Sequence, residues 1–332
     1  MAIPIYRPFE KFLFSNKTCF LSGETLVSEE EEIQVFPTWL MQAYQLEDKP
    51  FKLLDESITT YKKLKVPCST TAANQIALLE QEIESAFNSG FEAVNALDKL
   101  KLFQWIGKLI YGLVFREIQI GLRQQQISGE AINFSQALAK KFANLHLMLQ
   151  SLIQPMEFEV SLPFSIKIFE ITSEQDTFSY RDEINTLVFS LRMKNFGIVA
   201  CLQDNGANDK YNEEKLKKAM NKQLHPIQFE EVCGLYFYSA YLFNRLPEYT
   251  VLPTDDMIYI EPMPLGGADT RPIFDNFQAK TYGQVLENFW KPWGYTLFEI
   301  IKDPENPMTF LTDKNGEFRY SHTINLPDNP LL

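Results

Sequence analysis

The pattern of apolar and polar positions changes twice along the chain, and each stretch predicts a different kind of structure. Residues 1–73 show no sustained period, because turn signals such as Ser15-Asn16 and Ser22-Gly23 interrupt the apolar runs. Residues 74 to about 155 repeat apolar side chains every three or four positions, which is typical of helices. From residue 156 a period of two prevails, which predicts strands of an antiparallel sheet.

Three helices are expected in the middle stretch. The second of them, residues 97–122, is apolar on most sides, which indicates burial by neighbours on both flanks. The third covers about residues 133–152 and ends before Pro155. The first begins near Asn74 and presents one buried stripe, made of Ile76, Leu79, Ile83, Ala86 and Phe87.

The C-terminal stretch combines strands with further helices. Residues 158–162 and 166–171 alternate, and residues 187–193 and 197–202 flank Lys194-Asn195 as the two arms of a hairpin. Residues 204–209 are expected to be a loop, 213–221 and 226–245 helices, and 257–261 a strand. The fold class predicted is α+β, with domains at 1–155 and 156–332.

Composition narrows the range of partners. The 332 residues are 45% hydrophobic and 22% charged, as in a globular protein, and the net charge is −12. Residues 1–150 carry a net charge of −2 and residues 151–332 one of −10. Duplex binding depends on Lys and Arg contacts to phosphate, so a protein partner is favoured over nucleic acid. The most apolar helical stretch, residues 102–115, contains Lys108 and is too short to span a bilayer, so no membrane partner is expected.

The cysteines indicate the compartment. Cys19, Cys68, Cys201 and Cys233 are scattered, with no pair at metal-ligand or redox spacing, which is typical of reduced thiols in a cytoplasmic protein. The N-terminus has neither the basic start nor the continuous apolar core of a signal peptide, which agrees with that location.

One motif is present without its polar residues. The chain contains a Cys-x-x-Ser-Gly turn, the segment Ile-Gln-Val-Phe-Pro-Thr-Trp-Leu, a Val-Pro-Cys segment and a following asparagine. Over about residues 17–80 this order resembles the zinc-knuckle HNH endonuclease-like proteins of bacteria. That family has Cys-x-x-Cys, Glu-His-Val-Phe-Pro-x-Trp-Leu, and a second Cys-x-x-Cys followed by Asn. The matching positions here are Cys19, Ser22, Gln34, Cys68 and Asn74.

The resemblance implies a β-hairpin and a helix that grip a divalent cation, with a histidine that activates water. That histidine corresponds to Gln34, and an amide does not accept a proton at neutral pH. In the knuckles, Ser22 replaces one cysteine, and Thr70 and Ala73 lie where the later pair would fall. We therefore expect a degenerate member of the family, a pseudo-enzyme with no bound metal and no cofactor, whose task is to bind a partner.

The apolar frame offers a replacement for the metal. Phe36, Trp39 and Leu40 are expected to pack on the helical stripe that begins at Ile76. Each large side chain stabilises by roughly 1.5–3 kcal/mol when fully buried. Several of them would offset a structural zinc, which contributes on the order of 10 kcal/mol in small fingers.

Two alternatives keep an enzymatic function. One is a carboxylate-lined site in the C-terminal part, formed by Asp255, Asp256, Glu261 and Asp269, for a reaction that the sequence does not identify. The other is residual nuclease activity with a different metal constellation. The three histidines, His146, His225 and His322, lie more than 100 residues beyond Gln34. Serine-hydrolase, P-loop and kinase signatures are absent from the sequence.

Overall fold

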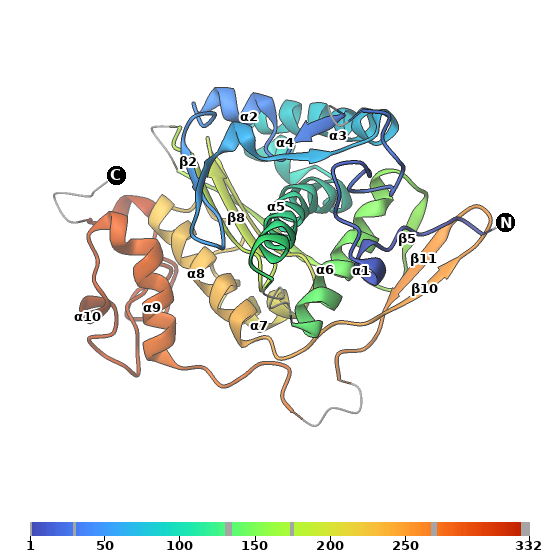
Figure 1. Cartoon of the computed structure of the whole chain (residues 1–332). Helices are drawn as coiled ribbons and strands as arrows, with labels where there is room; N and C mark the ends of the chain where they lie inside the picture. Colours follow the sequence, from blue (N-terminus) through green and yellow to red (C-terminus); the bar gives the residue numbers. More distant parts are fainter. Residues whose placement is uncertain (1, 29–30, 130–134, 173–175, 267–270, 327–332) are drawn as a thin grey trace. The chain divides into compact units, whose positions relative to one another are not determined.

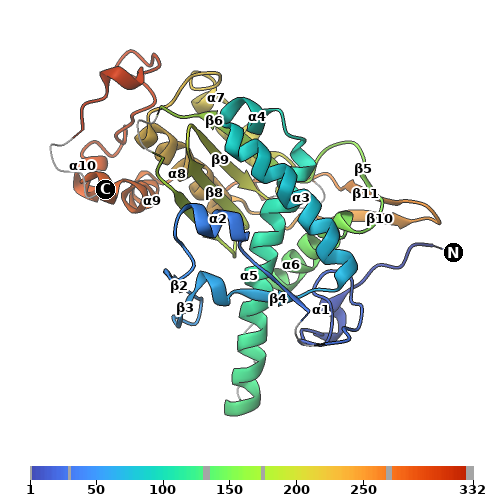
Figure 2. The ribbon, with the colours of Figure 1, turned by 90° about the horizontal axis from the view of Figure 1, so that it is seen from above.

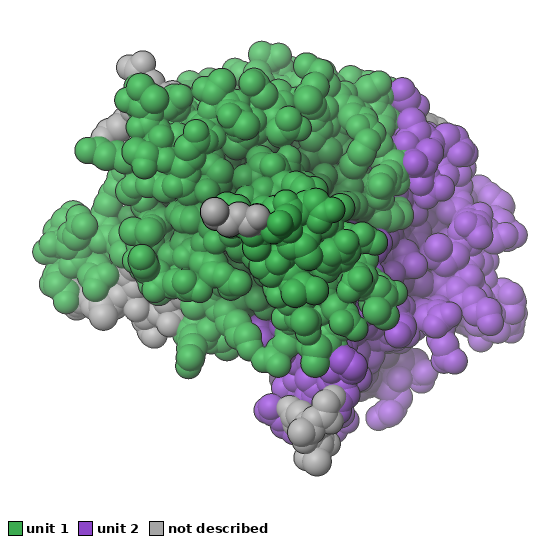
Figure 3. Space-filling model, turned by 90° about the vertical axis from the view of Figure 1, so that its right-hand side faces the viewer, with its two compact units in different colours: residues 1–88, 97–161, 248–263 green, residues 89–96, 162–247, 264–332 purple. Residues whose placement is uncertain are grey.

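The computed structural model describes residues 2–28, 31–129, 135–172, 176–266 and 271–326 and shows an α+β protein (Figure 1). The chain forms two compact units, which Figure 3 distinguishes by colour. Unit 1 comprises Met1–Asn88, Leu97–Ser161 and Glu248–Met263, and unit 2 comprises Ser89–Ala96, Leu162–Pro247 and Pro264–Leu332. The sequence places one boundary near residue 155. In the structure the chain passes into unit 2 at residue 162, and residues 248–263 return to unit 1, because a hairpin there pairs with a strand of that unit.

Unit 1 begins with short elements around one small hairpin. Strand β1 (Glu32–Gln34) pairs antiparallel with β4 (Lys65–Pro67), with Ile33 opposite Val66. Helix α3 (Thr70–Ser89) follows β4 directly. The insertion between the two strands contains α2 (Thr38–Ala43), β2 (Pro50–Lys52), β3 (Ile58–Thr60) and the 3₁₀ turn η1 (Tyr61–Lys63). Helix α1 (Pro8–Lys11) precedes them.

The centre of unit 1 is α5 (Lys99–Ser128), which Figure 2 shows beside α3 and α6. The Asp98 carboxylate accepts from the amide of Leu100 at its start, and Gly129 ends it with a positive φ of 74°. Fifteen α5 residues are buried, as the apolar pattern predicts. A Cβ at Gly107 would lie 2.7 Å from Leu149 of α6 (Gln136–Leu149), so this glycine allows the two helices to approach closely.

A small sheet completes unit 1. Strand β11 (Ile258–Pro262) pairs antiparallel with β10 (Tyr249–Pro253) and parallel with β5 (Met156–Phe158). The 3₁₀ turn η2 (Gln150–Leu152) joins α6 to β5. The predicted helices at 74, 97–122 and 133–152 are therefore confirmed with shifted ends, except that residues 133–134 lie outside the described residues.

Unit 2 contains a four-stranded antiparallel sheet, in which the strands lie in the order β6-β9-β8-β7. The hairpin predicted at Lys194-Asn195 is confirmed, and Lys194 has the positive φ of 48° that its turn requires. A Cβ at Gly197 would lie 2.4 Å from the ring of Phe229, so the helix that carries Phe229, α8 (Pro226–Leu242), packs closely on the sheet here. The strands are β6 (Ser165–Glu170), β7 (Ser179–Glu183), β8 (Val188–Met193) and β9 (Phe196–Cys201).

Helix α8 (Pro226–Leu242) is buried along almost its whole length, between the sheet and α9 (Ala279–Trp290). Trp290, Trp293 and Phe310 belong to the same core, so the C-terminal aromatic residues are packing groups. The loop expected at 204–209 is partly wrong, because α7 (Ala207–Leu216) begins inside it, after Gly206 adopts a φ of 75°. The other elements are α4 (Phe91–Asn95), η3 (Lys291–Trp293), α10 (Leu297–Ile300) and η4 (Ser321–Thr323).

A helix that spans a bilayer must be both long and predominantly apolar. In the described part of the chain, no helix combines these two properties.

Candidate functional site

The candidate site lies in unit 1, where the turn at residues 19–23 meets residues 66–68. These two stretches are called the first and second knuckle segments. Cys19 begins a tight turn in which its carbonyl oxygen accepts from the Gly23 amide, 3.1 Å away, and its amide donates to Glu24 at 2.8 Å. Gly23 has a φ of 74°, and a Cβ there would lie 2.3 Å from the Tyr6 ring. Only glycine fits both requirements, so the Ser22-Gly23 turn has a specific backbone reason.

The second knuckle segment lies against this turn. The amide of Phe20 donates to the carbonyl oxygen of Pro67 at 2.8 Å, which places Cys19 and Cys68 on adjacent stretches of backbone. Both cysteine side chains are buried, and the Cys68 thiol donates to the carbonyl oxygen of Ser69, 3.6 Å away. Two free cysteines that are 49 positions apart in sequence therefore lie on neighbouring backbone segments.

The pair is electrostatically asymmetric. The nearby Cys68 thiol, followed by the hydroxyl and amide of Ser22 and the amide of Ser69, lowers the pKa of Cys19 to about 5, against the opposing effect of burial. The Cys19 sulfur, together with burial, raises the pKa of Cys68 well above its ordinary value. The two shifts have opposite directions, so Cys19 is the more acidic of the two thiols.

The groups around Cys19 do not supply the ligands of the zinc that the resemblance implies. Structural zinc takes four ligands, which are most often thiolate or imidazole. The groups near the Cys19 sulfur include one further thiol, Cys68, and the Ser22 hydroxyl, which is a poor zinc ligand. Across the described part of the chain, no three or more His, Cys, Asp or Glu side chains are grouped so as to hold a metal ion. These residues do not fit a structural zinc.

Gln34 matches the histidine of the family's motif, and its side-chain amide is engaged in a local hydrogen bond. Its side-chain amide donates to the carbonyl oxygen of Lys62, 3.3 Å away. The ammonium of Lys108 donates to the carbonyl oxygens of Gln34 (2.8 Å) and Val35 (2.9 Å) and to the Glu80 carboxylate of α3 (2.7 Å). Lys108 is only 2% exposed, so a buried cation from α5 joins the hairpin to the following helix.

The remaining motif positions lie on the first turns of α3. Thr70 and Asn74 are exposed, and the Thr70 hydroxyl donates to the Glu31 carboxylate at 3.3 Å. Ala73 is partly buried and has no polar side chain. The structure thus brings Cys19, Ser22 and Cys68 together. Gln34 contacts Lys62 instead, and Asn74 is exposed on α3.

The apolar frame packs on α3 through Trp39, as predicted, and it also packs on α5. Trp39 stacks on Trp105 of α5, with ring centroids 6.4 Å apart, and meets Phe87 of α3 edge-on at 5.9 Å. The ring of Phe36 contacts two rings of the insertion, Phe51 at 5.7 Å and Tyr61 at 4.8 Å. The frame is therefore fastened to two helices through Trp39.

The histidines serve local structure. His146 is buried in α6, and its Nε2 lies 3.1 Å from the carbonyl oxygen of Phe20, so it supports the Cys19 turn from behind. Burial lowers the pKa of His146 to about 3, and the neutral ring donates this hydrogen bond. His225 caps α8 by accepting from the Ile227 amide at 3.2 Å. His322 stacks on Tyr320.

The carboxylates proposed for a C-terminal site do not converge in the described residues. Asp255 and Asp256 lie in the exposed turn between β10 and β11, where Asp256 accepts from the Thr254 hydroxyl at 2.8 Å. Glu261 is exposed near the other end of β11, opposite Thr250. Asp269 lies outside the described residues.

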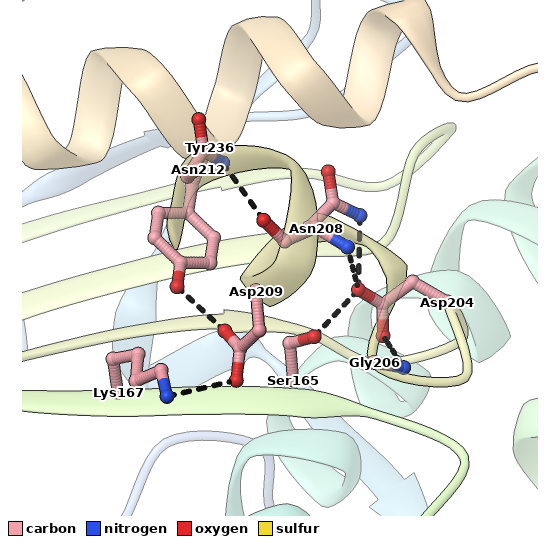
Figure 4. Close-up of polar contacts among 8 residues, drawn as sticks. All are labelled: Ser165, Lys167, Asp204, Gly206, Asn208, Asp209, Asn212 and Tyr236. Carbon is pink, nitrogen blue, oxygen red and sulfur yellow. Dashed lines mark hydrogen bonds and ion pairs between the residues drawn. The ribbon is translucent and has the colours of Figure 1, made fainter. Parts of the chain in front are cut away.

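Sequence reasoning missed a buried polar network in unit 2 (Figure 4). The Asp204 carboxylate accepts from the Ser165 hydroxyl (2.6 Å), from the backbone amide (2.9 Å) and side chain (3.0 Å) of Asn208, and from the Gly206 amide (3.1 Å). Burial raises the pKa of Asp204 to about 6. Beside it, Asp209 joins Lys167 at 3.1 Å to the Tyr236 hydroxyl at 2.6 Å.

The network fastens α7 to the sheet and to α8. The Asn212 amide extends it to the Ser239 hydroxyl, 2.9 Å away. A second buried carboxylate, Glu231, has the same fastening role, since it accepts from the Thr309 hydroxyl and the Phe310 amide, both at 2.6 Å. The polar residues at 204–209 predicted a loop, so only their long-range partners could have identified this network.

Comparisons with known proteins add no assignment. No protein-family model matches this chain, and neither a curated protein nor a solved structure matches it.

Proposed function

We propose that this chain is a binding protein related to the zinc-knuckle HNH nucleases, in which the metal and base positions no longer carry catalysis. One observation carries the proposal: the two knuckle segments meet near Cys19 and Cys68. The same region contains the antiparallel pair β1–β4, followed directly by helix α3. This is the order of elements that the resemblance implies, and its donor groups suit hydrogen bonding better than metal coordination.

The polar contacts support the loss of catalysis. Phosphodiester cleavage needs a group that accepts a proton and a cation that stabilises the leaving oxygen. Gln34 supplies only an amide, which is engaged with Lys62. Lys108 joins β1 to α3 as a fixed, buried cation, bonded to three oxygens, and its charge is shared with Glu80. Neither arrangement activates water.

The partner that suits this chain is a protein with a basic surface. The net charge is −12, and residues 151–332 carry most of it, so phosphate backbones are repelled and basic side chains are attracted. The exposed carboxylates of the β10–β11 turn belong to this acidic character, and they support charge complementarity better than a catalytic site, because they lie apart from Glu261.

The test combines three measurements on one preparation of the full chain: zinc by elemental analysis, plasmid nicking with magnesium or manganese, and duplex binding at low ionic strength. We expect no stoichiometric zinc, no nicking and no retardation of DNA, together with salt-sensitive association with an identified basic protein reconstituted from purified components. Nicking that is lost in Glu31→Ala or Asn74→Ala, but kept in the exposed control Glu82→Ala, would contradict the proposal.

A further inference from the structure

We propose that an aromatic surface of unit 2 receives an arginine side chain of a protein partner, and that the chain's own Lys215 occupies this surface when no partner is bound. Four rings, from α8 and from the start of α9, form the aromatic surface: Tyr238, Tyr241, Phe277 and Tyr282. The inference rests on the proposed function, since it names the group by which the basic partner is recognised. Nothing in the HNH resemblance supplies it, because that resemblance ends near residue 80.

Three of the rings are in mutual contact. The ring centroid of Tyr238 lies 5.4 Å from that of Phe277 and 5.5 Å from that of Tyr282. The centroids of Phe277 and Tyr282 are 5.4 Å apart, and their planes are inclined by 52°, so one cation can lie over both rings. The Tyr238 hydroxyl accepts from the amide of Gln278 at 2.7 Å and donates to its carbonyl oxygen at 3.1 Å, which holds the start of α9 against α8.

A cation of the chain already lies on the aromatic surface. The ammonium of Lys215, on α7, is 4.6 Å from the ring centroid of Phe277 and 5.6 Å from that of Tyr282, within the range of a cation–π interaction. Across the described residues, no carboxylate lies within ion-pair distance of this ammonium. The rings therefore hold the charge by themselves, and the surface accepts a cation.

The aromatic surface is open to a partner. Phe277 is 41% exposed and Tyr241 is 66% exposed, and Lys215 is exposed as well. Tyr241 stacks on Tyr238, with ring centroids 6.4 Å apart and planes at 21°, so it extends the surface beyond the buried rings. Exposed aromatic side chains that lie together are typical of interaction sites. An exposed lysine can leave such a surface by rotation about its own side-chain bonds.

Charge and hydration favour arginine as the group that replaces Lys215. Residues 151–332 carry a net charge of −10, which attracts basic side chains. Burial of its ammonium end lowers the pKa of Lys215, although the residue as a whole is exposed, because a strongly hydrated ammonium loses water against the rings. The guanidinium group of arginine is planar and more weakly hydrated, and it stacks on aromatic faces. A partner's arginine should therefore displace Lys215 more readily than a partner's lysine.

The experiment measures binding of the labelled peptide Gly-Arg-Gly-Arg-Gly to the folded full chain by fluorescence anisotropy at low ionic strength. Two matched peptides carry lysine or citrulline in place of arginine. Lysine keeps the charge without the planar group, and citrulline keeps the planar group without the charge. We expect the wild type to bind the arginine peptide most tightly, the lysine peptide less tightly and the citrulline peptide least tightly.

The first pair of variants removes a ring without changing the net charge. Phe277→Leu should weaken binding of the arginine peptide about two- to fivefold, which is the contribution of one exposed cation–π contact. Phe298→Leu is the matched control, since it removes a ring of α10 that is 77% exposed, and it should bind as the wild type does.

The second pair of variants removes a lysine from α7 or its C-terminal end. Lys215→Gln removes the internal competitor, so it should bind the arginine peptide more tightly than Lys217→Gln, again by about two- to fivefold. Lys217 is also exposed, and its substitution makes the same change in net charge. Any gain from the altered charge alone is therefore the same in both variants.

The inference is overturned if the wild type does not distinguish arginine from lysine. It is also overturned if Phe277→Leu binds like Phe298→Leu and Lys215→Gln binds like Lys217→Gln. Circular dichroism checks the fold of each variant, and the comparison of peptides on the wild type needs no variant to fold. If the peptides follow the expected order but no basic protein associates with the chain, the proposed function fails and the aromatic surface stands. If only the peptides fail, the proposed function stands.

Discussion

The ammonium of Lys108 lies 2.7 Å from the carboxylate of Glu80, and this ion pair joins the helix at the centre of unit 1 to the helix that follows the β1–β4 hairpin. Lys108 uses its other two hydrogen bonds for the carbonyl oxygens of Gln34 and Val35. All three of its protons are therefore satisfied, which is the condition under which a buried charge is tolerated. The buried ammonium group of Lys108 therefore links the β1–β4 hairpin to helix α3.

Replacing Lys108 by Met should destabilise unit 1 by about 3–5 kcal/mol, because the carbonyl oxygens of Gln34 and Val35 and the Glu80 carboxylate lose their shared donor. Urea denaturation measures the change as a lower midpoint with an unchanged slope.

Lys101→Met is the matched control, since Lys101 of α5 also pairs with a glutamate of α3, Glu82, at 2.7 Å. Both side chains of that pair are more than 40% exposed, so its loss should cost less than about 1 kcal/mol. Equal losses in the two variants would show that burial of Lys108 is unimportant.

Trp39→Ala should also destabilise unit 1, by about 3 kcal/mol, because its ring fills the space between Phe87 and Trp105. Phe298→Ala is the control, since Phe298 is 77% exposed and its loss should change stability by less than about 0.5 kcal/mol. Tryptophan fluorescence during denaturation reports the change. A Trp39 variant as stable as the wild type would contradict the hypothesis that aromatic packing supplies the stability that a structural zinc would otherwise give.

The periodic helices were predictable from sequence, and the polar contacts were not. The stripe from Ile76 to Phe87 predicts α3 because each member is repeated at the helical period and is buried. Lys108 interrupts an otherwise apolar segment, and only the fold reveals that two backbone carbonyls and Glu80 surround it. A residue's partners at long range leave no local pattern.

The candidate site shows the same limit. Cys19, Ser22 and Cys68 were selected by comparison with a motif, and the structure brings them together. The spacing of Cys19 and Cys68 matches no local metal or redox motif, so the approach of their backbone segments could not be predicted from sequence. Asp204 was hidden for a related reason, since a loop rich in Asp, Asn and Gly gives no sign that Ser165 will meet its carboxylate.

Asp204→Asn should change how stability depends on pH. Burial raises the pKa of Asp204 from 3.8 in the unfolded chain to about 6, so its protonated form contributes stability at low pH that is lost as pH rises through 6. At about 1.4 kcal/mol per pKa unit, the stability of the wild type relative to Asp204→Asn should fall by roughly 3 kcal/mol between pH 4 and pH 7. Urea denaturation at several pH values measures it, and a constant difference would contradict the assigned direction.

Cys19 should produce a slope of the opposite sign. Its pKa falls to about 5 in the folded chain, so the folded state binds fewer protons than the unfolded state between that value and an unfolded thiol pKa near 8.5. The stability of the wild type relative to Cys19→Ser should therefore rise with pH over this window, by about 1.4 kcal/mol per pH unit. It should be lost again as pH falls through 5. Denaturation across the window gives the slope, ultraviolet absorbance of the thiolate gives the pKa directly, and Cys233→Ser, whose thiol stays protonated, should run parallel to the wild type. A flat difference for Cys19→Ser would show that the sulfur is a neutral thiol and that the Ser22 and Ser69 donors do not stabilise a charge.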